Sequence, residues 1–323
     1  MHESPAKGSP STAAPIQAAL QQFFGYSSFR SPQQDIVECL LQKQDALIVL
    51  PTGGGKSICF QLPALMQPGV TLVISPLVAL MENQVQELRQ KNLPAALIHS
   101  ELPKSQYRQT LWLLANQRLR LLYLSPETLL SAKVWDVLCQ PNLVVNGLIL
   151  DEAHCLVQWG DTFRPAYYRL GSVRRSLRDA QNKPLTVQHS QIPIAAFTAT
   201  ADPTTQQTIQ RILQLENPHS FRLSPYRSNL HLALQTVWTP RQRRQRLLAL
   251  IQQHPDQSGL VYVRTRRDSE QLATWLSQQG YSTAAYHAGL SAQERRAIEQ
   301  AWLTQRLGFV VCTNAFGMEL IKQ

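Results

Sequence analysis

Ala-Leu-Ile-Val-Leu-Pro-Thr-Gly-Gly-Gly-Lys-Ser, residues 46–57, joins an apolar run to a glycine-rich turn. The run from Leu47 to Leu50 has the length and branching of a buried strand, and Ile58-Cys59-Phe60 is suited to the start of a helix. A glycine turn between a strand and a helix directs several backbone N–H groups at one anion, and the helix N-terminus adds partial positive charge. The stretch therefore predicts a phosphate-binding loop.

Two side chains complete the predicted loop. We expect Lys56 to reach the β- and γ-phosphates of a nucleotide and the Ser57 hydroxyl to bind Mg²⁺. The strict pattern G-x-x-x-x-G-K-[ST] is not met, because Leu50 stands in place of its first glycine. A glycine turn with a chance lysine is the alternative interpretation. The remaining nucleotide contacts of the loop are predicted at four residues: Thr52, Gly53, Gly54 and Gly55.

Length and composition set the class of protein. A chain of 323 residues is long enough for two domains, and an apolar content of 44% is ordinary for a soluble globular protein. No apolar run approaches the roughly 20 residues that span a bilayer, and residues 1–14 lack the apolar region of a secretory signal. We therefore expect no membrane partner and a disordered lead-in over residues 1–15. The 5 cysteines, none spaced as C-x-x-C, indicate reduced thiols in the cytoplasm and no zinc site.

Positive charge is concentrated in the second part of the chain. Residues 1–202 carry 17 basic and 14 acidic side chains, a surplus of +3, and residues 203–323 carry 14 and 7, a surplus of +7, which together give the formal +10. Such a surplus fits a polyanionic partner such as nucleic acid. A solvated basic face is the commoner explanation.

Short β-rich runs alternate with amphipathic helical patterns after the glycine loop. Alternation of this kind predicts a parallel sheet covered on both faces, with ligands beyond the carboxyl ends of its strands. The pattern is interrupted at Asn217-Pro218 and Ser224-Pro225 and then resumes, which predicts two α/β units in tandem. The strands are expected at 71–75, 95–99, 121–125, 143–150, 194–198, 260–263, 282–286 and 309–312, and the helices at 77–90, 104–116, 166–178, 269–279 and 292–303.

Aromatic and amide side chains precede the glycine loop at residues 24–34. Tyr26 is suited to stack on an adenine base, and the Gln33 amide to pair with its donor and acceptor edge. A hydrophobic staple at a helix entry explains the segment about as well.

Asp151-Glu152-Ala153-His154 follows the apolar run Leu148-Ile149-Leu150. A carboxylate at the end of a buried strand, beside a phosphate loop on a neighbouring strand, is suited to hold Mg²⁺ through water. We assign that role to Asp151. Glu152 is suited to orient and deprotonate an attacking water. A capped helix start after a strand is the structural alternative.

Together the glycine loop and the acidic motif resemble those of superfamily 2 helicases, and in detail those of the RecQ DNA helicases. Phe24-Gly25-Tyr26, Phe29-Arg30 and Gln33 match the N-terminal motif of RecQ helicases, which implies that Arg30 joins the adenine pocket. The resemblance covers about residues 20–318 and implies an α/β fold of two tandem RecA-like P-loop domains with parallel sheets. The implied boundaries are 16–217 for the first domain, 218–229 for a linker and 230–323 for a second, incomplete domain.

Further motifs resemble the family's nucleic-acid contacts. Ser75-Pro76-Leu77 and Ser125-Pro126-Glu127 look like strand-end motifs that touch the nucleic-acid backbone. Phe197-Thr198-Ala199-Thr200-Ala201 resembles the motif that couples the nucleotide site to strand movement, with Thr198 and Thr200 as its polar members.

The loop at residues 158–165 is the most specific match. Its sequence, Gln158-Trp159-Gly160-Asp161-Thr162-Phe163-Arg164-Pro165, is similar to the aromatic-rich loop that senses single-stranded DNA in RecQ proteins. Trp159 and Phe163 offer stacking faces for bases, and Arg164 offers a phosphate contact or a bridge to Glu152.

In the second half, three motifs resemble those of the family. Val261-Tyr262-Val263-Arg264-Thr265-Arg266 has Thr265 where the family usually has serine. Tyr286-His287-Ala288-Gly289-Leu290 and Thr313-Asn314-Ala315-Phe316-Gly317-Met318 match well, which implies nucleic-acid or coupling roles for His287 and Thr313.

The match ends after Met318. The family pattern continues with Gly, Ile or Val, Asp or Asn, and Lys, whereas this sequence reads Glu319-Leu320-Ile321-Lys322-Gln323. A one-base deletion in Gly-Ile-Asp-Lys codons gives Glu-Leu-Ile-Lys, so we expect a frameshifted or fragmentary reading frame. The Gln-x-x-Gly-Arg-x-Gly-Arg stretch, whose arginines cross the domain cleft, is not present; such an arginine is worth roughly 10³–10⁵ in rate. We also expect residues 230–323 to be loosely folded in isolation.

The resemblance implies an ATP-dependent DNA helicase that uses ATP and Mg²⁺. It further implies translocation from 3′ to 5′ on single-stranded DNA and unwinding of partly duplex DNA in repair and recombination. Activity of this chain is expected to be impaired. An RNA helicase and a catalytically inactive nucleotide- and DNA-binding fragment remain as alternatives; the loop at 158–165 disfavours the first of these.

Overall fold

A computed structural model of the chain describes residues 13–159, 165–181, 192–224, 226, 229–255, 257–314 and 316. The chain divides into two compact units, residues 1–228 and residues 229–323. Each unit has its own parallel sheet.

The first unit is built on a seven-stranded sheet in which every pair of neighbouring strands is parallel. The strand order is β3-β4-β2-β5-β6-β1-β7. The central strands are short apolar runs with both faces buried, as expected when helices cover both sides of a parallel sheet. The strands are β1 (Ala46–Val49), β2 (Val70–Ile74), β3 (Ala95–Ile98), β4 (Leu121–Leu124), β5 (Val145–Leu150), β6 (Ile194–Thr198) and β7 (His219–Arg222).

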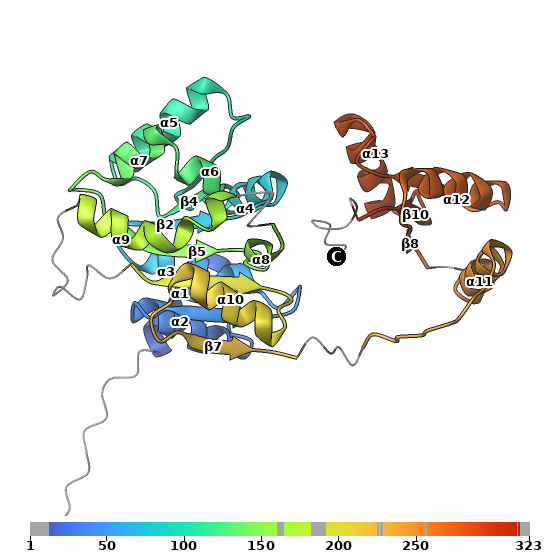
Figure 1. Cartoon of the computed structure of the whole chain (residues 1–323), viewed down its shortest axis with the longest axis horizontal. Coiled ribbons are helices and arrows are strands. Elements are labelled where there is room, and N and C mark those ends of the chain that lie inside the picture. The colour runs from blue at the N-terminus through green and yellow to red at the C-terminus, as the bar shows by residue number, and fades with distance from the viewer. Residues whose placement is uncertain are drawn as a thin grey trace, which may run out of the picture. The chain divides into compact units, whose positions relative to one another are not determined.

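Helices cover both faces of this sheet (Figure 1). The helices of the first unit are α1 (Ala13–Phe24), α2 (Gln33–Leu41), α3 (Lys56–Met66), α4 (Val78–Gln90), α5 (Lys104–Ala115), α6 (Pro126–Leu129), α7 (Ala132–Leu138), α8 (Cys155–Trp159), α9 (Leu170–Ala180) and α10 (Pro203–Leu213), with a 3₁₀ helix at Pro165–Tyr167.

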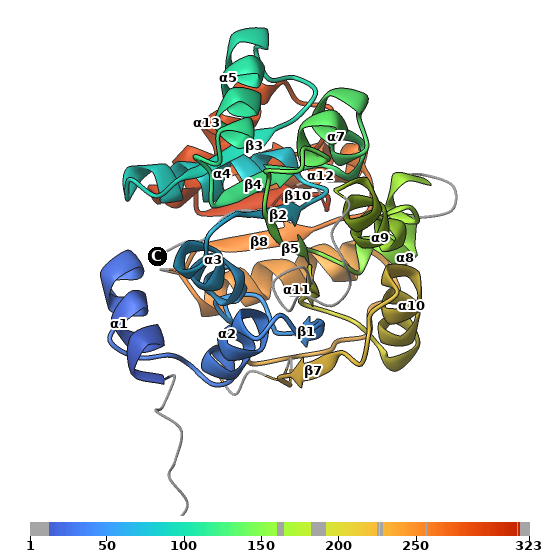
Figure 2. The same cartoon turned by 90° about the vertical axis from the view of Figure 1, so that its left-hand side faces the viewer.

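Two apolar cores lie on opposite faces of the sheet. Side chains alternate along each strand, so Leu47 belongs to the core that includes residues of α5, α7, α9 and α10, whereas Ile48 belongs to the core that includes residues of α2, α3 and α4. A third cluster joins α1, α2 and α3 through Ile16, Val37 and Leu62, and Figure 2 shows these three helices side by side.

The second unit has a three-stranded parallel sheet of order β8-β10-β9. Its cores are smaller: α13 packs on one side through Trp302, and α11 and α12 pack on the other through Ile251 and Leu276. The strands are β8 (Gly259–Tyr262), β9 (Thr283–Tyr286) and β10 (Phe309–Cys312), and the helices are α11 (Pro240–Gln253), α12 (Arg266–Gln278) and α13 (Ala292–Leu303).

The α/β class and the parallel sheets predicted from the sequence are confirmed, and the boundaries differ in two places. Residues 1–12 lie outside the described part of the chain, but Ala13 already begins α1, so the expected lead-in over 1–15 is too long. Strand β7 falls inside the segment expected to be a linker, 218–229, yet it pairs with β1 in the first sheet. Among the described residues, every helix is too short or too polar to cross a membrane.

Candidate functional site

The glycine loop lies between β1 and α3, as predicted. Gly53 (φ 79°) and Gly55 (φ 72°) adopt left-handed backbone conformations that favour glycine. Gly54 donates its N–H to the Pro51 carbonyl at 3.0 Å, and a Cβ added at Gly54 would lie 2.9 Å from that oxygen. Gly55 is the N-cap of α3 and has no side chain to cap it, so the first-turn N–H groups remain available to an anion.

Lys56 and the acidic motif meet at the carboxyl edge of the sheet. Lys56 Nζ lies 3.7 Å from Glu152 Oε1, although the two residues are distant in sequence. Asp151 follows β5 directly and is buried. The acidic motif was expected on the strand next to that of the glycine loop, whereas β6 lies between β1 and β5. The two motifs still meet, because parallel strands end at the same edge.

The backbone turns sharply at the acidic motif. Glu152 has a left-handed conformation (φ 50°), and its N–H donates to Asp151 Oδ1 at 3.0 Å. Ala153 N–H donates to the Phe197 carbonyl at 2.8 Å, which ties the motif to β6. Because of this turn, the two successive carboxylates point in different directions. The Asp151 carboxylate is buried, and the Glu152 carboxylate lies near Lys56.

His154 connects Glu152 to the threonine motif at the end of β6. Its Nδ1 lies 3.3 Å from Glu152 Oε2 and 3.1 Å from Thr198 Oγ1. Thr198 Oγ1 in turn donates to the Thr200 carbonyl at 3.0 Å. The structure therefore brings Thr198 and Thr200 to the acidic motif. His154 is part of the acidic motif in the sequence, but its contacts with Glu152 and Thr198 were not predicted.

The ionisable groups have unequal pKa values. Burial, and then the neighbouring Glu152 charge, raise the pKa of Asp151 to about 6. Burial also acts to raise the pKa of Glu152, but the hydrogen bond to His154 and the charge of Lys56 outweigh it, so the pKa is lowered. The Cys155 thiol, 3.6 Å from His154 Nε2, and the Glu152 carboxylate together raise the pKa of His154 to about 9. Glu152 is thus an ionised carboxylate held by two cationic side chains at neutral pH.

Gln84 is a site residue that sequence analysis missed. It lies on α4 and its side chain hydrogen-bonds to Asp151. Its Oε1 is buried without a hydrogen-bond partner among the described residues. An amide on an amphipathic helix gives no local sequence signal of such a contact.

The N-terminal motif contacts the glycine loop through Gln33. Gln33 Nε2 donates to the Gly54 and Gly55 carbonyls, each at 3.3 Å, and its Oε1 accepts from the Arg30 N–H at 2.9 Å. Gln33 is thus bonded directly to the glycine loop, and its predicted contact with adenine stays a prediction. Tyr26 is 53% exposed, which leaves its ring free to stack on a base.

The predicted residues fit a magnesium–nucleotide complex. Mg²⁺ binds proteins through one or two carboxylates or hydroxyls together with substrate phosphates and water. Asp151 and the half-buried Ser57 on α3 are such ligands at one edge of the sheet. The orphaned Gln84 Oε1 adds an acceptor suited to a metal-bound water. Within the described part of the chain, no group of three or more His, Cys, Asp or Glu is placed to hold a metal ion by itself.

The strand-end motifs lie at the same edge. Ser75 is buried after β2, next to buried Pro76, and its Oγ is 3.5 Å from the Leu77 N–H. Ser125 follows β4 and caps α6 by accepting from the Thr128 N–H at 3.2 Å. Their contacts with nucleic acid stay predictions.

The loop at 158–165 is described only in part. Gln158 and Trp159 form the end of α8, and Pro165 begins the 3₁₀ helix. The side chains of Gln158 and Trp159, and all of Phe163 and Arg164, lie outside the described residues. Their predicted DNA contacts stay predictions.

In the second unit, His287 and Thr313 follow β9 and β10 at one edge of the smaller sheet. His287 is buried; its Nε2 lies 3.0 Å from Glu270 Oε1, and its Nδ1 accepts from the Gly289 N–H at 3.2 Å. The Thr313 N–H donates to the Tyr286 carbonyl at 3.1 Å.

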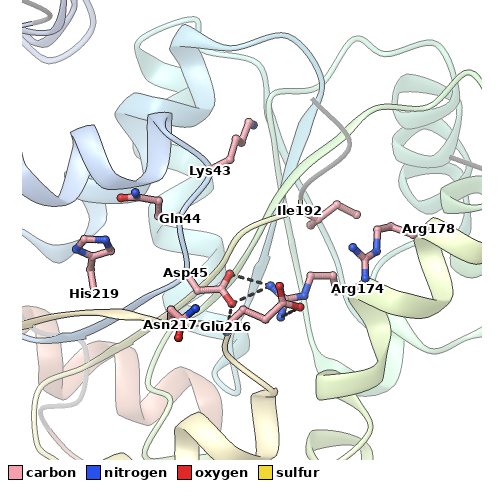
Figure 3. Close-up of a pocket in the computed structure, with 9 residues that line it drawn as sticks. All are labelled: Lys43, Gln44, Asp45, Arg174, Arg178, Ile192, Glu216, Asn217 and His219. Atoms are coloured by element: carbon pink, nitrogen blue, oxygen red, sulfur yellow. Dashed lines mark hydrogen bonds and ion pairs between the residues drawn. The ribbon is translucent and has the colours of Figure 1, made fainter. Parts of the chain in front are cut away.

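A second polar pocket lies at the opposite, amino-terminal edge of the first sheet (Figure 3). Asp45 there receives two hydrogen bonds from Arg174, at 2.9 and 2.8 Å, and one each from the Ile194 and Glu216 N–H groups, at 2.8 and 2.7 Å. Its carboxylate is therefore fully engaged, and the pocket is a structural network rather than a nucleotide site.

Family models cover most of the chain. Residues 30–209 match the model described as DEAD/DEAH box helicase, and residues 242–318 match the model described as helicase conserved C-terminal domain. The two matched regions fall within the two compact units.

Curated relatives are similar along nearly the whole chain. "ATP-dependent DNA helicase RecQ" of Synechocystis sp. is 54% identical over 308 residues, covering 95% of this chain and 63% of that protein. "Probable ATP-dependent DNA helicase RecS" of Bacillus subtilis is 37% identical, covering 95% and 59%. "ATP-dependent DNA helicase RecQ" of Haemophilus influenzae is 38% identical, covering 94% and 46%. The chain thus spans less than two thirds of the length of these relatives.

Solved helicase structures share the fold. S. cerevisiae dbp5, in a structure bound to gle1 and IP6, matches with a TM-score of 0.67 and 16% identity, covering 94% of this chain and 74% of that one. Mycobacterium smegmatis helicase Lhr, in a structure bound to ssDNA and AMP-PNP, matches with a TM-score of 0.65 and 20% identity, covering 92% and 41%.

Proposed function

This chain belongs to the DEAD/DEAH box helicases, with RecQ DNA helicases among its relatives, and we propose that it is an ATP-hydrolysing motor of the RecQ type that acts on DNA. One observation carries the proposal: Lys56 of the glycine loop lies 3.7 Å from Glu152 of the acidic motif. That distance is within the span of one triphosphate, which supports a phosphate-binding role for Lys56 and a general-base role for Glu152. We propose the two domains as residues 13–228 and 229–323.

The first unit binds the nucleotide through its own residues. ATP with Mg²⁺ supplies the phosphoanhydride bond that is cleaved and the metal charge that offsets the phosphates. Lys56 and the N–H groups of the glycine loop hold the β- and γ-phosphates, and Ser57 and Asp151 hold the metal. Tyr26 stacks on the base, and Gln33 joins the base to the loop through its bonds to Gly54 and Gly55.

Glu152 orients the attacking water and accepts its proton. His154 and Lys56 keep the Glu152 carboxylate ionised, since both lie within ion-pair distance of it. An ionised carboxylate has a free lone pair for the proton of water. When Glu152 accepts the proton its charge is lost, which weakens its attraction to His154. The hydrogen bond between His154 and Thr198 then passes this change to the end of β6.

DNA is the proposed polymer. The sheet edge that carries the acidic motif also carries three residues that follow strands: Ser75, Pro76 and Ser125. Their position supports contacts with the nucleic-acid backbone near the nucleotide. Gln158, Trp159, Phe163 and Arg164 supply stacking and phosphate contacts in the proposal, and His287 and Thr313 supply the contacts of the second unit. By resemblance to the family, movement runs from 3′ to 5′ on single-stranded DNA, and the setting is repair and recombination in the cytoplasm.

The test is DNA-stimulated ATP hydrolysis by the full chain and its Lys56→Ala variant. Removing one preorganised charge from a phosphate site costs about 10²–10³ in rate. We expect Lys56→Ala to lower phosphate release by at least that factor. The control is Lys133→Ala, an exposed lysine on α7, which should match the wild type.

Two rivals give different results in the same assay. An RNA helicase responds to poly(U) more strongly than to oligo(dT), whereas the proposal requires the reverse. An inactive fragment binds a fluorescent ATP analogue and DNA but releases no phosphate with either polymer. Failure to bind nucleotide at all would overturn the motor interpretation.

A further inference from the structure

The start of α11 in the second unit carries four arginines and no acidic residue. The helix reads Pro-Arg-Gln-Arg-Arg-Gln-Arg-Leu-Leu-Ala-Leu-Ile-Gln-Gln, and the arginines are 241, 243, 244 and 246. All four are exposed. Among the described residues, no ion pair joins any of them to a carboxylate.

Folding gains little from these arginines. The N-terminal end of a helix is its positive end, so cations in the first turns are unfavourable there. The apolar side of α11 is formed by Leu247 and Ile251, which pack against α12. Only Arg244 has a described partner within the unit, with its guanidinium 5.4 Å from the centroid of Trp275. Among the described residues, Arg241, Arg243 and Arg246 have neither an ion-pair partner nor an aromatic ring beside them.

An exposed aromatic residue precedes these arginines in the chain. Trp238 is 86% exposed, and its N–H donates to Gln242 Oε1 at 3.0 Å. Gln242 is also half of a capping box with Thr239, which defines where α11 begins. The backbone of Trp238 is therefore held at the start of the helix while its ring remains in solvent.

Arginines beside an exposed aromatic ring match the chemistry of single-stranded DNA. Phosphates pair with guanidinium groups, and any base stacks on an indole without regard to sequence. We propose that Trp238 and Arg241, Arg243 and Arg246 form a surface, here called the α11 surface, that binds a segment of single-stranded DNA. None of these residues belongs to the helicase motifs identified in the sequence. The choice of DNA as the ligand rests on the proposed function, whereas the location of the surface does not.

The arginine contacts are tested by the salt dependence of binding. A triple variant, Arg241→Gln with Arg243→Gln and Arg246→Gln, is compared with the wild-type chain by fluorescence anisotropy of labelled oligo(dT) over a range of NaCl. For single strands each phosphate contact adds about 0.7 to the slope of log affinity against log salt. We expect the slope to fall by about 1.4–2.1 and the affinity at low salt to fall roughly tenfold.

A charge-matched control separates local contacts from net charge. The variant Arg211→Gln with Arg296→Gln and Arg306→Gln removes the same charge from exposed positions elsewhere. It should keep the wild-type slope. The α11 triple variant should unfold at the same temperature as wild type or slightly above it, because its lost charges lay at the positive end of a helix.

The stacking contact is tested separately at Trp238. Trp238→Ala should weaken oligo(dT) binding roughly tenfold and leave binding to a blunt duplex unchanged, since paired bases are not free to stack. Trp238→Phe should restore most of the loss.

Three outcomes overturn the inference. In the first, the wild-type chain binds oligo(dT) but both the triple variant and Trp238→Ala bind it equally well. In the second, the triple variant weakens duplex binding alone. In the third, the slope of log affinity against log salt falls as much in the charge-matched control as in the α11 triple variant. A wild-type chain that binds oligo(dT) yet hydrolyses no ATP would instead count against the proposed motor and leave the α11 surface standing.

Discussion

Gly55 connects the glycine loop to the N-terminal motif because it lacks a side chain. It adopts φ 72°, and a Cβ at this position would collide with Gln33 Nε2. The same Gln33 nitrogen donates to the Gly54 and Gly55 carbonyls. A residue of any other type would thus strain the backbone and displace the amide at once.

Gly55→Ala should lower ATP affinity by at least tenfold and the free energy of unfolding by about 1 kcal/mol, the usual cost of a left-handed alanine. Gly280→Ala is the control, since Gly280 has φ 88° and no atom within 4 Å of an added Cβ. It should show the same loss of stability with unchanged nucleotide binding. Titration of a fluorescent ATP analogue and urea unfolding measure the two effects. Equal ATP affinity in both variants would contradict the role of the Gln33 contact.

Lys43 provides a pH-dependent test of the amino-terminal edge of the first sheet. Its Nζ donates to the Asn146 carbonyl at 2.9 Å and to Asn146 Oδ1, and burial lowers its pKa to about 8. The unfolded chain has a lysine pKa near 10.4 and therefore binds this proton more tightly. The stability contributed by Lys43 should rise as the pH increases through about 8 towards about 10.4.

Lys43→Met keeps most of the side-chain volume but does not titrate. The free energy of unfolding of the wild type, minus that of Lys43→Met, should therefore increase between pH 7.5 and pH 10. Thermal or urea unfolding at a series of pH values gives this difference directly. Parallel stability curves for the two proteins would show that Lys43 does not titrate in this range.

Single residues also show how far sequence can specify a site. Lys56 and Glu152 were predictable because the glycine turn and the acidic motif each have a local signature, and parallel strands end at one edge. Gln84 was not, since its contact with Asp151 depends on how α4 packs. The hydrogen bonds from Gln33 to the loop carbonyls could not be predicted from the sequence for the same reason. The local sequence pattern identifies the charged residues of the site, whereas tertiary packing determines which neutral side chains contact them.

Among the elements, α9 is joined to the amino ends of β1 and β6 by one buried ion pair. Asp45 precedes β1, and its carboxylate accepts hydrogen bonds from Arg174 of α9 (Figure 3). The same carboxylate accepts from the Ile194 N–H of β6. Arg174 also donates to the Gln214 carbonyl at 2.6 Å, after α10. Loss of one partner would leave a buried charge without compensation.

Asp45→Asn should therefore lower the free energy of unfolding by about 3–5 kcal/mol, the usual cost of breaking a buried pair on one side. Arg175→Gln is a matched control, because Arg175 lies on the same helix in an exposed pair with Asp179 and should cost less than 1 kcal/mol. The double variant Asp45→Asn with Arg174→Met should recover part of the loss. Urea unfolding distinguishes these cases. An Asp45→Asn variant as stable as Arg175→Gln would refute the structural role.

Strand β7 and helix α11 were not predicted, and both lack apolar periodicity. Strand β7 is largely exposed and reads His-Ser-Phe-Arg, so only its pairing with β1 identifies it. The first turns of helix α11 consist mostly of arginines and glutamines, a pattern typical of a charged surface segment. Proline after threonine and the glutamine at 242 did carry a capping-box signal. The bounds of the strands buried on both faces were predicted to within a residue or two, because short continuous apolar runs are typical of buried strands.

At the scale of the whole molecule, the two units differ in how much each can bury. The first has a seven-stranded sheet with large cores on both faces, whereas the second has a three-stranded sheet with two small clusters. Near the start of the second unit, Leu232 and Leu234 are 89% and 97% exposed. The second unit should thus unfold at the lower temperature, and proteases should cut within residues 229–238 first.

Nucleotide should act unequally on the two units, because Lys56, Asp151 and Glu152 all belong to the first. A ligand at 100 times its dissociation constant adds about 2.7 kcal/mol to the state that binds it, which for a unit of this size raises the midpoint by about 5–10 °C. Scanning calorimetry with and without Mg²⁺-ATP should show that shift in the upper transition. Lys56→Ala should abolish the shift while leaving both transitions in place, since Lys56 is a proposed ligand contact and is not part of the apolar core. If Mg²⁺-ATP raised the lower transition as much as the upper one, the second unit would have to share the ligand, and the assignment of the site to the first unit alone would be wrong.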